Sequence, residues 1–312
     1  MKSKVIIPDK FISKFKEIIN PEEIDSFILY CKKKLTKSIR VNTLKYKGDI
    51  TKNIYFEENK IILKQIKYVK QAYLIKSEVS SIGNTIEQLL GYFQIQEVSS
   101  MLPALILNPN ENDIVLDLTA APGNKTAFLA QIMNNKGLII ANDIDETRIK
   151  TLKYTLKKLG VTNTIIFSKD GIDFDINLKF NKILLDAPCS CEGIVRKKPR
   201  SLINWSEQLV KSKSDLQKKL ILNAYDLLEK NGTLVYSTCT MSPEENEEVI
   251  DYLIKKRPNL KIENVNIENL NTNYGIIKYK LKEYNQNIKN AIRIYPHKTD
   301  LEGFFICKIK KI

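Results

Sequence analysis

The sequence predicts an α/β protein with a doubly wound, mostly parallel sheet and a small N-terminal α+β domain. From residue 113 onward, short apolar runs typical of buried strands alternate with stripes of helical spacing. One stripe is ended by Gly160, a residue type that favours the carboxyl end of a helix, and it comprises Ile149, Leu152, Leu156 and Leu159. Repeated strand–helix–strand units imply a parallel sheet that is covered by helices on both faces, with ligands at the carboxyl ends of the strands.

The N-terminal domain is expected to span residues 1–80. Apolar residues at helical spacing predict a first helix over Phe11–Ile19, and Asn20 followed by Pro21 predicts the start of a second. Short β-rich segments follow over residues 37–76. A boundary near residue 80 leaves residues 81–312 as the larger domain.

The larger domain is expected to alternate between the two element types. Its predicted strands and helices are the strand Ile114–Leu116, the helix Thr126–Met133, the strand Gly137–Ala141, the helix ended by Gly160, the strands Thr164–Phe167 and Lys182–Leu185, a helix from Trp205 to Asn231, and the strand Thr233–Tyr236. Residues 256–290 are expected to form a peripheral strand and a long connection.

The charge of the chain is strongly positive and unevenly distributed. The net charge is +14, and residues 1–80 hold 18 basic against 9 acidic groups. A basic lobe beside a nearly balanced one predicts binding to a phosphate backbone. The alternative is a Lys-rich composition without functional meaning.

The composition also indicates a cellular setting. No apolar run approaches the ~20 residues that cross a bilayer, and none near the start has the length of a signal peptide. Five cysteines in 312 residues do not resemble a disulfide framework. We therefore expect a cytoplasmic protein with reduced thiols and no membrane partner.

A loop after the first predicted strand has the features of a cofactor site. Small residues at Ala120, Ala121 and Gly123 allow a ligand to approach the backbone, and the following helix offers free N–H groups. A phosphate-binding NTPase loop is a poor match, because Asn124 stands where that loop needs glycine. Asp143, 20 positions after Gly123, suits a ribose.

A second carboxylate completes this predicted site. Asp170 follows the third strand and suits an adenine amino group, so the set predicts an adenosine-containing ligand without a triphosphate. The alternative is that Asp143 and Asp170 only cap helices or turns.

Two cysteines follow two neighbouring strands of the predicted sheet. Cys189 comes three residues after Asp186 at the end of the fourth strand, and Cys239 follows the fifth. Cysteines in polar loops are unusual, because structural cysteines prefer burial. The alternatives are a disulfide, a metal pair or incidental packing. We expect no metal, because Cys189 and Cys191 lack the usual zinc spacing and His297 is the one histidine.

A nucleophilic thiol has a particular use beside a methyl donor. Carbon 5 of cytosine is too electron-poor to attack a sulfonium methyl group, but addition of a thiolate at carbon 6 makes carbon 5 nucleophilic. The addition is helped by an acid at ring nitrogen 3, for which Asp186 is the nearest candidate if burial keeps it protonated.

These motifs together resemble the Nop/Sun family of RNA (cytosine-5) methyltransferases over nearly the whole chain. The matching segments are Arg40–Thr43, Gln96–Ser100, Ala120–Lys125, Asp143, Asp170, Asp186–Ser190, Ser237–Thr240, Pro243–Glu247 and Arg293–His297. The chain departs from the family pattern at Asn124 and at Cys191, where glycine is usual.

The resemblance implies a fold, a cofactor and a role for each matching residue. The fold would be the Rossmann-like one of S-adenosylmethionine-dependent methyltransferases. Cys239 would be the covalent nucleophile, Cys189 would assist release of the adduct, and Asp186 would orient the cytosine beside the cofactor. S-adenosylmethionine would be bound by Thr119, Ala120, Ala121, Pro122, Gly123, Asn124, Lys125, Asp143, Arg148, Asp170 and Asp186.

The RNA partner is expected to be tRNA rather than rRNA, and the protein to be a monomer. A basic loop after Cys189 is a candidate for phosphate contacts and contains Arg196, Lys197, Lys198 and Arg200. The alternative is an ordinary solvated loop. Arg40 is a candidate either for RNA binding or for bridging parts of the fold. A non-catalytic RNA-binding factor and an amino-group methyltransferase are the competing functions, and neither would need both thiols.

Overall fold

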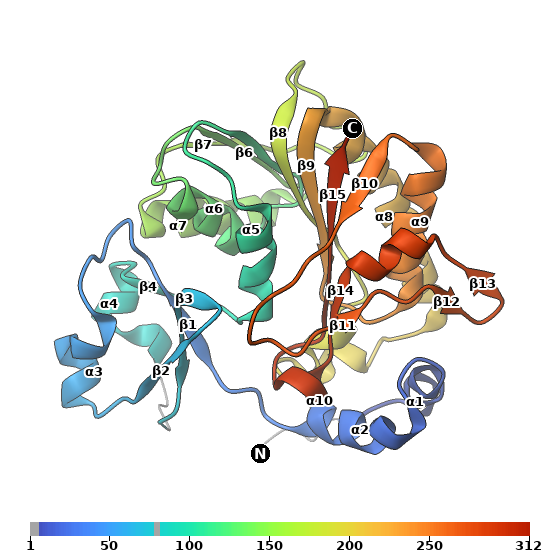
Figure 1. Ribbon diagram of the computed structural model, residues 1–312. Coiled ribbons are helices and arrows are strands. Elements are labelled where there is room, and N and C mark those ends of the chain that lie inside the picture. Colours follow the sequence, from blue (N-terminus) through green and yellow to red (C-terminus); the bar gives the residue numbers. More distant parts are fainter. Residues whose placement is uncertain (1–5, 78–81) are drawn as a thin grey trace. The chain divides into compact units, whose positions relative to one another are not determined.

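The computed structural model describes residues 6–77 and 82–312 (Figure 1). The chain divides into two compact units. The middle unit comprises Thr36–Phe174 and Phe180–Leu184. The N/C unit comprises the chain up to Leu35, Asp175–Lys179 and Leu185–Ile312. One strand, β8 (Phe180–Asp186), therefore begins in the middle unit and ends in the N/C unit.

The middle unit begins with a small antiparallel sheet in the strand order β2–β3–β1–β4. The elements of this part are β1 (Ser38–Val41), α3 (Ile54–Glu58), β2 (Leu63–Ile66), β3 (Val69–Ile75), α4 (Ile86–Leu89) and β4 (Phe93–Ile95). Its core packs Ile39, Val41, Phe56 and Phe93. The predicted boundary near residue 80 lies in 78–81, outside the described residues, and the small sheet continues beyond it because Ile39 pairs with Ile95.

The middle unit continues with the parallel strands that the sequence predicts. β5 pairs in parallel with both β6 and β8, and β6 pairs in parallel with β7. The elements are α5 (Leu102–Leu107), β5 (Ile114–Asp117), α6 (Asn124–Ile132), β6 (Leu138–Asn142), α7 (Glu146–Leu159) and β7 (Thr164–Phe167). The Asp145 side chain caps the start of α7, and Gly160 ends it in the left-handed conformation, as the sequence predicts. Figure 1 shows α6 and α7 lying along this sheet.

The N/C unit contains antiparallel strands around β15, which pairs with β9, β14 and β10. Its later elements are α8 (Glu207–Leu227), β9 (Leu228–Thr238), α9 (Glu247–Lys256), β10 (Leu260–Glu263), β11 (Asn273–Tyr274), β12 (Lys278–Tyr279), β13 (Lys282–Glu283), β14 (Ile292–Ile294), α10 (Pro296–Thr299) and β15 (Phe304–Lys311). Figure 1 shows α8 and α9 side by side in this unit. The sequence placed the end of α8 at Asn231, but the helix ends at Leu227, because Leu228 is already extended and buried in β9.

The two N-terminal helices belong to the N/C unit and not to the small sheet. They are α1 (Asp9–Lys16) and α2 (Ile24–Lys32), and a short 3-10 turn over Pro21–Glu23 precedes α2. Phe11, Phe15 and Phe27 pack in one core cluster with Trp205 and Tyr295. The predicted single domain over residues 1–80 is therefore split between the units, since these aromatic contacts tie its helices to the C-terminal part.

Residues 256–290 contain the predicted peripheral strand, β10, and the short hairpin of β12 and β13. Within residues 6–77 and 82–312, no helix is long and apolar enough to cross a membrane.

Candidate active site

The loop between β5 and α6 is shaped by one glycine. Gly123 has φ +99°, a conformation that L residues rarely adopt, and it precedes the first residue of α6. A Cβ atom at this position would lie 2.8 Å from Leu152 Cδ1 and 3.3 Å from Thr155 Cβ. The glycine therefore lets the loop pack closely on α7 while the first N–H groups of α6 remain directed outward from the helix start.

The small residues of the loop are fixed by hydrogen bonds from the next strand end. The Ala120 N–H donates to the Asn142 carbonyl at 2.7 Å, and the Ala121 N–H donates to Asp143 Oδ2 at 3.1 Å. Arg148 donates to the Ala121 carbonyl and lies 3.5 Å from Asp143 Oδ2. Asp143 is thus buried and holds the loop, while Arg148 stays half-exposed at its side.

Asn142 is a site residue that the sequence analysis missed. Its side chain donates to the Leu118 carbonyl at 3.2 Å and the Lys169 carbonyl at 2.9 Å, and it accepts from the Lys169 N–H at 3.0 Å. It joins the loop after β5 to the segment that carries the exposed Asp170, whose Oδ1 accepts from the Ile172 N–H. In the sequence, the signal for Asn142 was an amide residue directly after an apolar strand. The structure shows that this amide is buried, and a buried amide requires hydrogen-bond partners.

The side chains of Asn124 and Lys125, at the start of α6, are held by neighbouring polar side chains. Asn124 Oδ1 accepts from the Gln94 side chain at 2.9 Å, and Lys125 Nζ donates to Ser100 Oγ at 3.0 Å. Pro122 is exposed and Thr119 is half-buried. The observed donors and carboxylates suit a ligand with hydroxyl, amino and carboxylate groups, which S-adenosylmethionine carries.

The two predicted thiols lie together in the N/C unit. Cys189 Sγ and Cys239 Sγ are 3.3 Å apart, at the ends of β8 and β9. A third thiol, Cys191 Sγ, lies 3.7 Å from Cys239 Sγ. The five cysteines are free thiols, so the disulfide alternative does not describe this structure.

The loops that carry the thiols are held together by backbone contacts. The Ala187 N–H donates to the Ser237 carbonyl at 2.8 Å, and the Gly193 N–H donates to the Cys239 carbonyl at 2.9 Å. Gly193 has no room for a side chain, because a Cβ atom would lie 2.0 Å from the Gly303 carbonyl oxygen. The parallel-sheet prediction implied that these strand ends lie close together. The two backbone hydrogen bonds hold them there.

Asp186 occupies the last position of β8 and is half-buried. Its Oδ1 accepts a hydrogen bond from Ser237 Oγ at 2.7 Å. The carboxyl group is therefore held at the same strand ends as Cys189 and Cys239.

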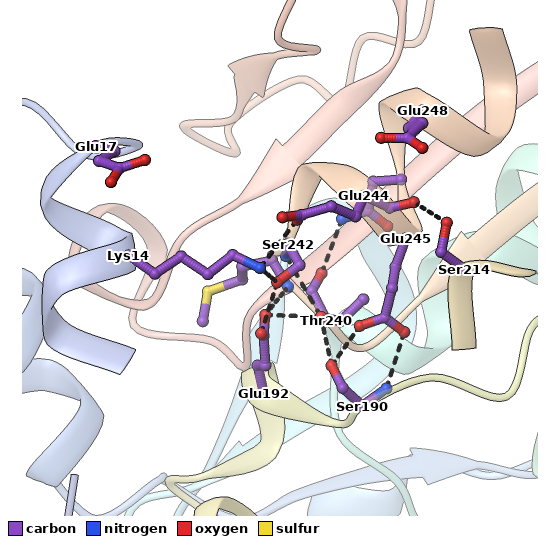
Figure 2. A network of polar contacts seen from close by, with 12 residues as sticks. Lys14, Glu17, Ser190, Glu192, Ser214, Thr240, Ser242, Glu244, Glu245 and Glu248 are labelled. Atoms are coloured by element: carbon purple, nitrogen blue, oxygen red, sulfur yellow. Dashed lines mark hydrogen bonds and ion pairs between the residues drawn. The ribbon is translucent and has the colours of Figure 1, made fainter. Parts of the chain in front are cut away.

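A network of buried polar side chains supports these loops (Figure 2). Glu245 accepts from the Ser190 N–H at 2.9 Å, from the Ser190 hydroxyl at 2.5 Å and from Gln217 Nε2 at 2.9 Å. The Ser190 and Thr240 hydroxyl oxygens are 3.0 Å apart, so the residue after Cys189 contacts the residue after Cys239. Sequence reasoning included Glu245 in a family motif but gave it no role.

A second buried carboxylate, Glu192, completes the network. It accepts from Thr240 Oγ1 at 2.7 Å, from Ser242 Oγ at 2.6 Å and from Trp205 Nε1 at 2.7 Å. Lys14 of α1 is also buried and donates to Ser242 Oγ at 2.7 Å. Figure 2 shows Thr240 between Glu192 and Glu245, so both carboxylates act on the segment that carries Cys239.

Burial and mutual contacts shift the acidity of these groups. Burial, together with the charge of Glu192, raises the pKa of Glu245 to about 7 despite its hydrogen bonds. A hydrogen bond from Cys189 lowers the pKa of Cys239, but the contact with Cys191 and burial outweigh it, and the net shift is upward. Hydrogen bonds from Cys189 and Cys239 lower the pKa of Cys191 to about 3. Of the three thiols, Cys191 is therefore the one that ionises most readily, because the contacts within the cluster and burial raise the pKa of Cys189 and the net pKa of Cys239.

The structure separates the candidate RNA-binding residues into two groups. Arg40 is buried over the Phe128 ring and donates to Gln96 Oε1 at 2.9 Å and to Gln131 Oε1. Arg196 is buried too, with donors to the Leu301 carbonyl at 3.0 Å and to Asp300 Oδ1 at 2.6 Å.

These two guanidinium groups donate to protein acceptors, whereas the sequence made Arg40 and Arg196 candidates for contacts with RNA. Arg40 bridges parts of the fold, the alternative that the sequence left open. Lys197, Lys198 and Arg200 are exposed and remain candidates. His297 is buried against the Phe27 ring, with its Nε2 3.5 Å from Glu23.

Comparisons with protein families match both parts of the chain. The family model described as 16S rRNA methyltransferase RsmB/F matches residues 104–310, and that for the N-terminal domain of 16S rRNA methyltransferase RsmF matches residues 7–98. A tRNA (cytosine(49)-C(5))-methyltransferase of Pyrococcus abyssi is 40% identical over 307 residues, covering 98% of this chain and 96% of the relative. A ribosomal RNA small subunit methyltransferase F of Vibrio vulnificus is 38% identical over 319 residues, covering 100% of this chain.

The chain spans 66% of the length of that Vibrio relative. Among solved structures, a methyltransferase homolog protein from Pyrococcus horikoshii has a TM-score of 0.85 at 33% identity, with 99% of this chain and 96% of that one covered. NSun6 from Pyrococcus horikoshii with SFG has the same fold, with a TM-score of 0.85 at 24% identity and coverage of 97% and 98%. The chain belongs to the RsmB/F family of RNA methyltransferases, the Nop/Sun group that its motifs resemble.

Proposed function

We propose that this protein transfers a methyl group from S-adenosylmethionine to carbon 5 of a cytosine in tRNA, through a covalent bond between Cys239 and carbon 6. The observation that carries the proposal is the pair of thiols 3.3 Å apart at the ends of β8 and β9. An amino-group methyltransferase needs no thiol. The family and its two named relatives support RNA cytosine-5 methylation as the reaction class.

The chemistry begins at Cys239. Its thiolate adds to carbon 6 of the base, which forms a carbon–sulfur bond and moves the carbon 5–carbon 6 electron pair onto carbon 5 and the ring. Asp186 would orient the cytosine and act as the proton donor to ring nitrogen 3. The Cys189 and Cys239 sulfur atoms are 3.3 Å apart, and a hydrogen bond from the Cys189 thiol opposes the raising of the Cys239 pKa by Cys191 and by burial.

The adduct must then be resolved. When bound, S-adenosylmethionine would supply its methyl group to carbon 5; the methyl–sulfonium bond would break with its electron pair on sulfur, and S-adenosylhomocysteine would leave. Cys189, after losing its own proton to solvent, removes the remaining proton from carbon 5. The carbon 5–carbon 6 double bond re-forms, the Cys239 thiolate leaves carbon 6, and ring nitrogen 3 returns its proton to Asp186. This division gives Cys239 and Cys189 one task each and leaves Cys191 without a task in the reaction.

The cofactor would be held by the loop Ala120–Lys125 and the neighbouring strand ends. The N–H groups at the start of α6 suit its carboxylate. Asp143 suits the ribose hydroxyls and Asp170 the adenine amino group. Thr119 and Arg148 flank the loop and would complete the site.

The RNA target and its contacts are also proposals. The tRNA target rests on the greater identity of the Pyrococcus abyssi tRNA enzyme, at 40% against 38% for the Vibrio rRNA enzyme. Lys197, Lys198 and Arg200 are exposed beside the thiol loop and would contact RNA phosphates. A monomer in the cytoplasm remains the expected state.

Covalent trapping tests the mechanism. Cys189→Ala should accumulate a protein–RNA complex on a denaturing gel, because methylated adduct forms and cannot be resolved. Cys239→Ala should form none, and Cys307→Ala, which removes a buried thiol away from the cluster, should behave as wild type. If Cys239→Ala forms the complex, or if Cys189→Ala does not, the division of roles is refuted.

A further inference from the structure

Cys191 is a third thiol at the site and is not used by the proposed reaction. Its Sγ atom lies 3.7 Å from Cys239 Sγ, which in turn lies 3.3 Å from Cys189 Sγ. All three sulfur atoms lie within 4.8 Å of one another. The sequence argued against a metal site because Cys189 and Cys191 are one residue apart, but the end of β9 supplies the third ligand that this spacing alone lacks.

The backbone conformation at Cys191 favours glycine over cysteine. Its φ is +59°, in the left-handed region where a side chain costs ~1 kcal/mol relative to glycine. Glycine would satisfy this turn, so the turn itself does not account for a thiol here. The Sγ atom is directed toward the cluster, 3.5 Å from the Cys189 carbonyl.

The spacing of the sulfur atoms fits coordination of a thiophilic ion. Tetrahedral zinc with metal–sulfur bonds of ~2.3 Å requires sulfur atoms ~3.8 Å apart. The Cys191–Cys239 distance of 3.7 Å meets this requirement, and the Cys189–Cys239 distance of 3.3 Å needs a small outward movement. Three protein ligands leave the fourth position open for water.

The loops that carry the thiols are already ordered. The Ala187–Ser237 and Gly193–Cys239 backbone hydrogen bonds hold their positions, and the Glu245–Ser190 contacts shown in Figure 2 fix the residue between Cys189 and Cys191. An ion would therefore bind without the ordering cost that an unformed site imposes.

Cys31 packs in the core cluster with Phe11 and Phe15 and is not one of the three thiols that lie within 4.8 Å of one another. Burial raises the pKa of Cys31 to about 12, so that thiol does not offer a thiolate ligand near neutral pH.

We propose that Cys189, Cys191 and Cys239 bind one thiophilic divalent cation of the Zn²⁺ class, and that the bound ion blocks the enzyme. Binding forms three metal–sulfur bonds, and the displaced thiol protons pass to solvent. The inhibitory consequence rests on the proposed function, because the ion occupies the nucleophile Cys239. The binding itself does not depend on that function.

Zinc titration of the full chain tests the site directly. Purified, reduced and chelator-stripped protein is titrated with Zn²⁺ against a chromophoric chelator, and native mass spectrometry counts the bound ions. Wild type should bind one ion tightly, and Cys191→Ala and Cys191→Gly should each weaken its binding by at least ~10- to 100-fold, the loss that removal of an outer-shell partner alone produces. Cys31→Ala should bind zinc as wild type does.

Methyl transfer is measured in parallel with and without Zn²⁺. Cys191→Gly should retain methyl transfer to RNA and require at least ~10-fold more Zn²⁺ for half inhibition than wild type. Zinc affinity that is unchanged in both Cys191 variants, or a wild type without tight zinc binding, would overturn the proposal. Wild type that binds one ion but methylates no RNA would uphold the site and refute the proposed function instead.

Discussion

At the residue scale, the reactivity of the site depends on groups that surround the thiols as much as on the thiols themselves. Cys239 is adjacent to Thr240, whose hydroxyl lies between the buried carboxylates Glu192 and Glu245. Two buried carboxylates near one another cannot both ionise cheaply. Burial of Glu245, together with the charge of nearby Glu192, accounts for its raised pKa and predicts a pH-dependent contribution to stability.

Glu245→Gln should remove this pH dependence, because glutamine does not titrate. The pKa of Glu245 is about 7 in the folded protein against 4.5 for the unperturbed group, so its protonation stabilises the fold at low pH. This stabilisation is complete below about pH 4.5 and is lost as pH rises through about 7. Relative to wild type, Glu245→Gln should therefore gain stability between pH 5 and pH 8, by up to about 3 kcal/mol.

Denaturant unfolding of both proteins at the two pH values measures this difference. Glu58→Gln removes an exposed carboxylate and serves as the control, with a difference from wild type that stays flat. An equal difference between Glu245→Gln and wild type at pH 5 and pH 8 would show that Glu245 does not titrate in this range.

At the element scale, the proposed cofactor loop and the loop that contains Cys189 are both turns that follow strands. The turn from β5 into α6 depends on Gly123, and the turn after β8 depends on Gly193. Both glycines permit a close approach that a Cβ atom would prevent. Small-residue patterns in the sequence identified the first turn, whereas the second became evident only from the contact between Gly193 and Gly303.

Gly123→Ala tests the turn after β5. The added Cβ would clash with Leu152 at 2.8 Å and would force a strained φ, so the loop should shift away from α7. We expect at least a ~10-fold weaker affinity for S-adenosylmethionine and a loss of about 1–3 kcal/mol in unfolding free energy.

Isothermal titration calorimetry and denaturant unfolding measure the two effects. Gly83→Ala is the matched control, since its Cβ would meet only Ile95 Cδ1 at an ordinary 3.5 Å. Wild-type affinity in Gly123→Ala would remove the β5–α6 turn from the proposed cofactor site.

At the scale of the whole molecule, the sequence predicted those features of the fold that depend on local residue patterns. The parallel strands, α7 with its Gly160 end and the meeting of Cys189 with Cys239 follow from periodicity and from the rule that parallel strands share their carboxyl ends. Contacts between distant residues could not be read in this way.

Three particular differences show the limit of local patterns. The aromatic face of α1 packs with Trp205, about 190 residues away, so the N-terminal helices leave the predicted N-terminal domain. Arg196 is expected from the sequence to lie in an RNA-contacting loop and the role of Arg40 is left open, whereas both are buried on acceptors from distant segments. Glu192 has no motif that marks it, because its role depends on Trp205, Thr240 and Ser242 together.

The proposed function requires that this chain methylates carbon 5 of cytosine in RNA through Cys239. The most direct measurement incubates the protein with labelled S-adenosylmethionine and separate pools of tRNA and 16S rRNA, and then identifies the modified nucleoside by mass spectrometry. We expect 5-methylcytosine in tRNA with wild type and none with Cys239→Ala. A methyl group on another atom, or 5-methylcytosine formed equally well by Cys239→Ala, would contradict it.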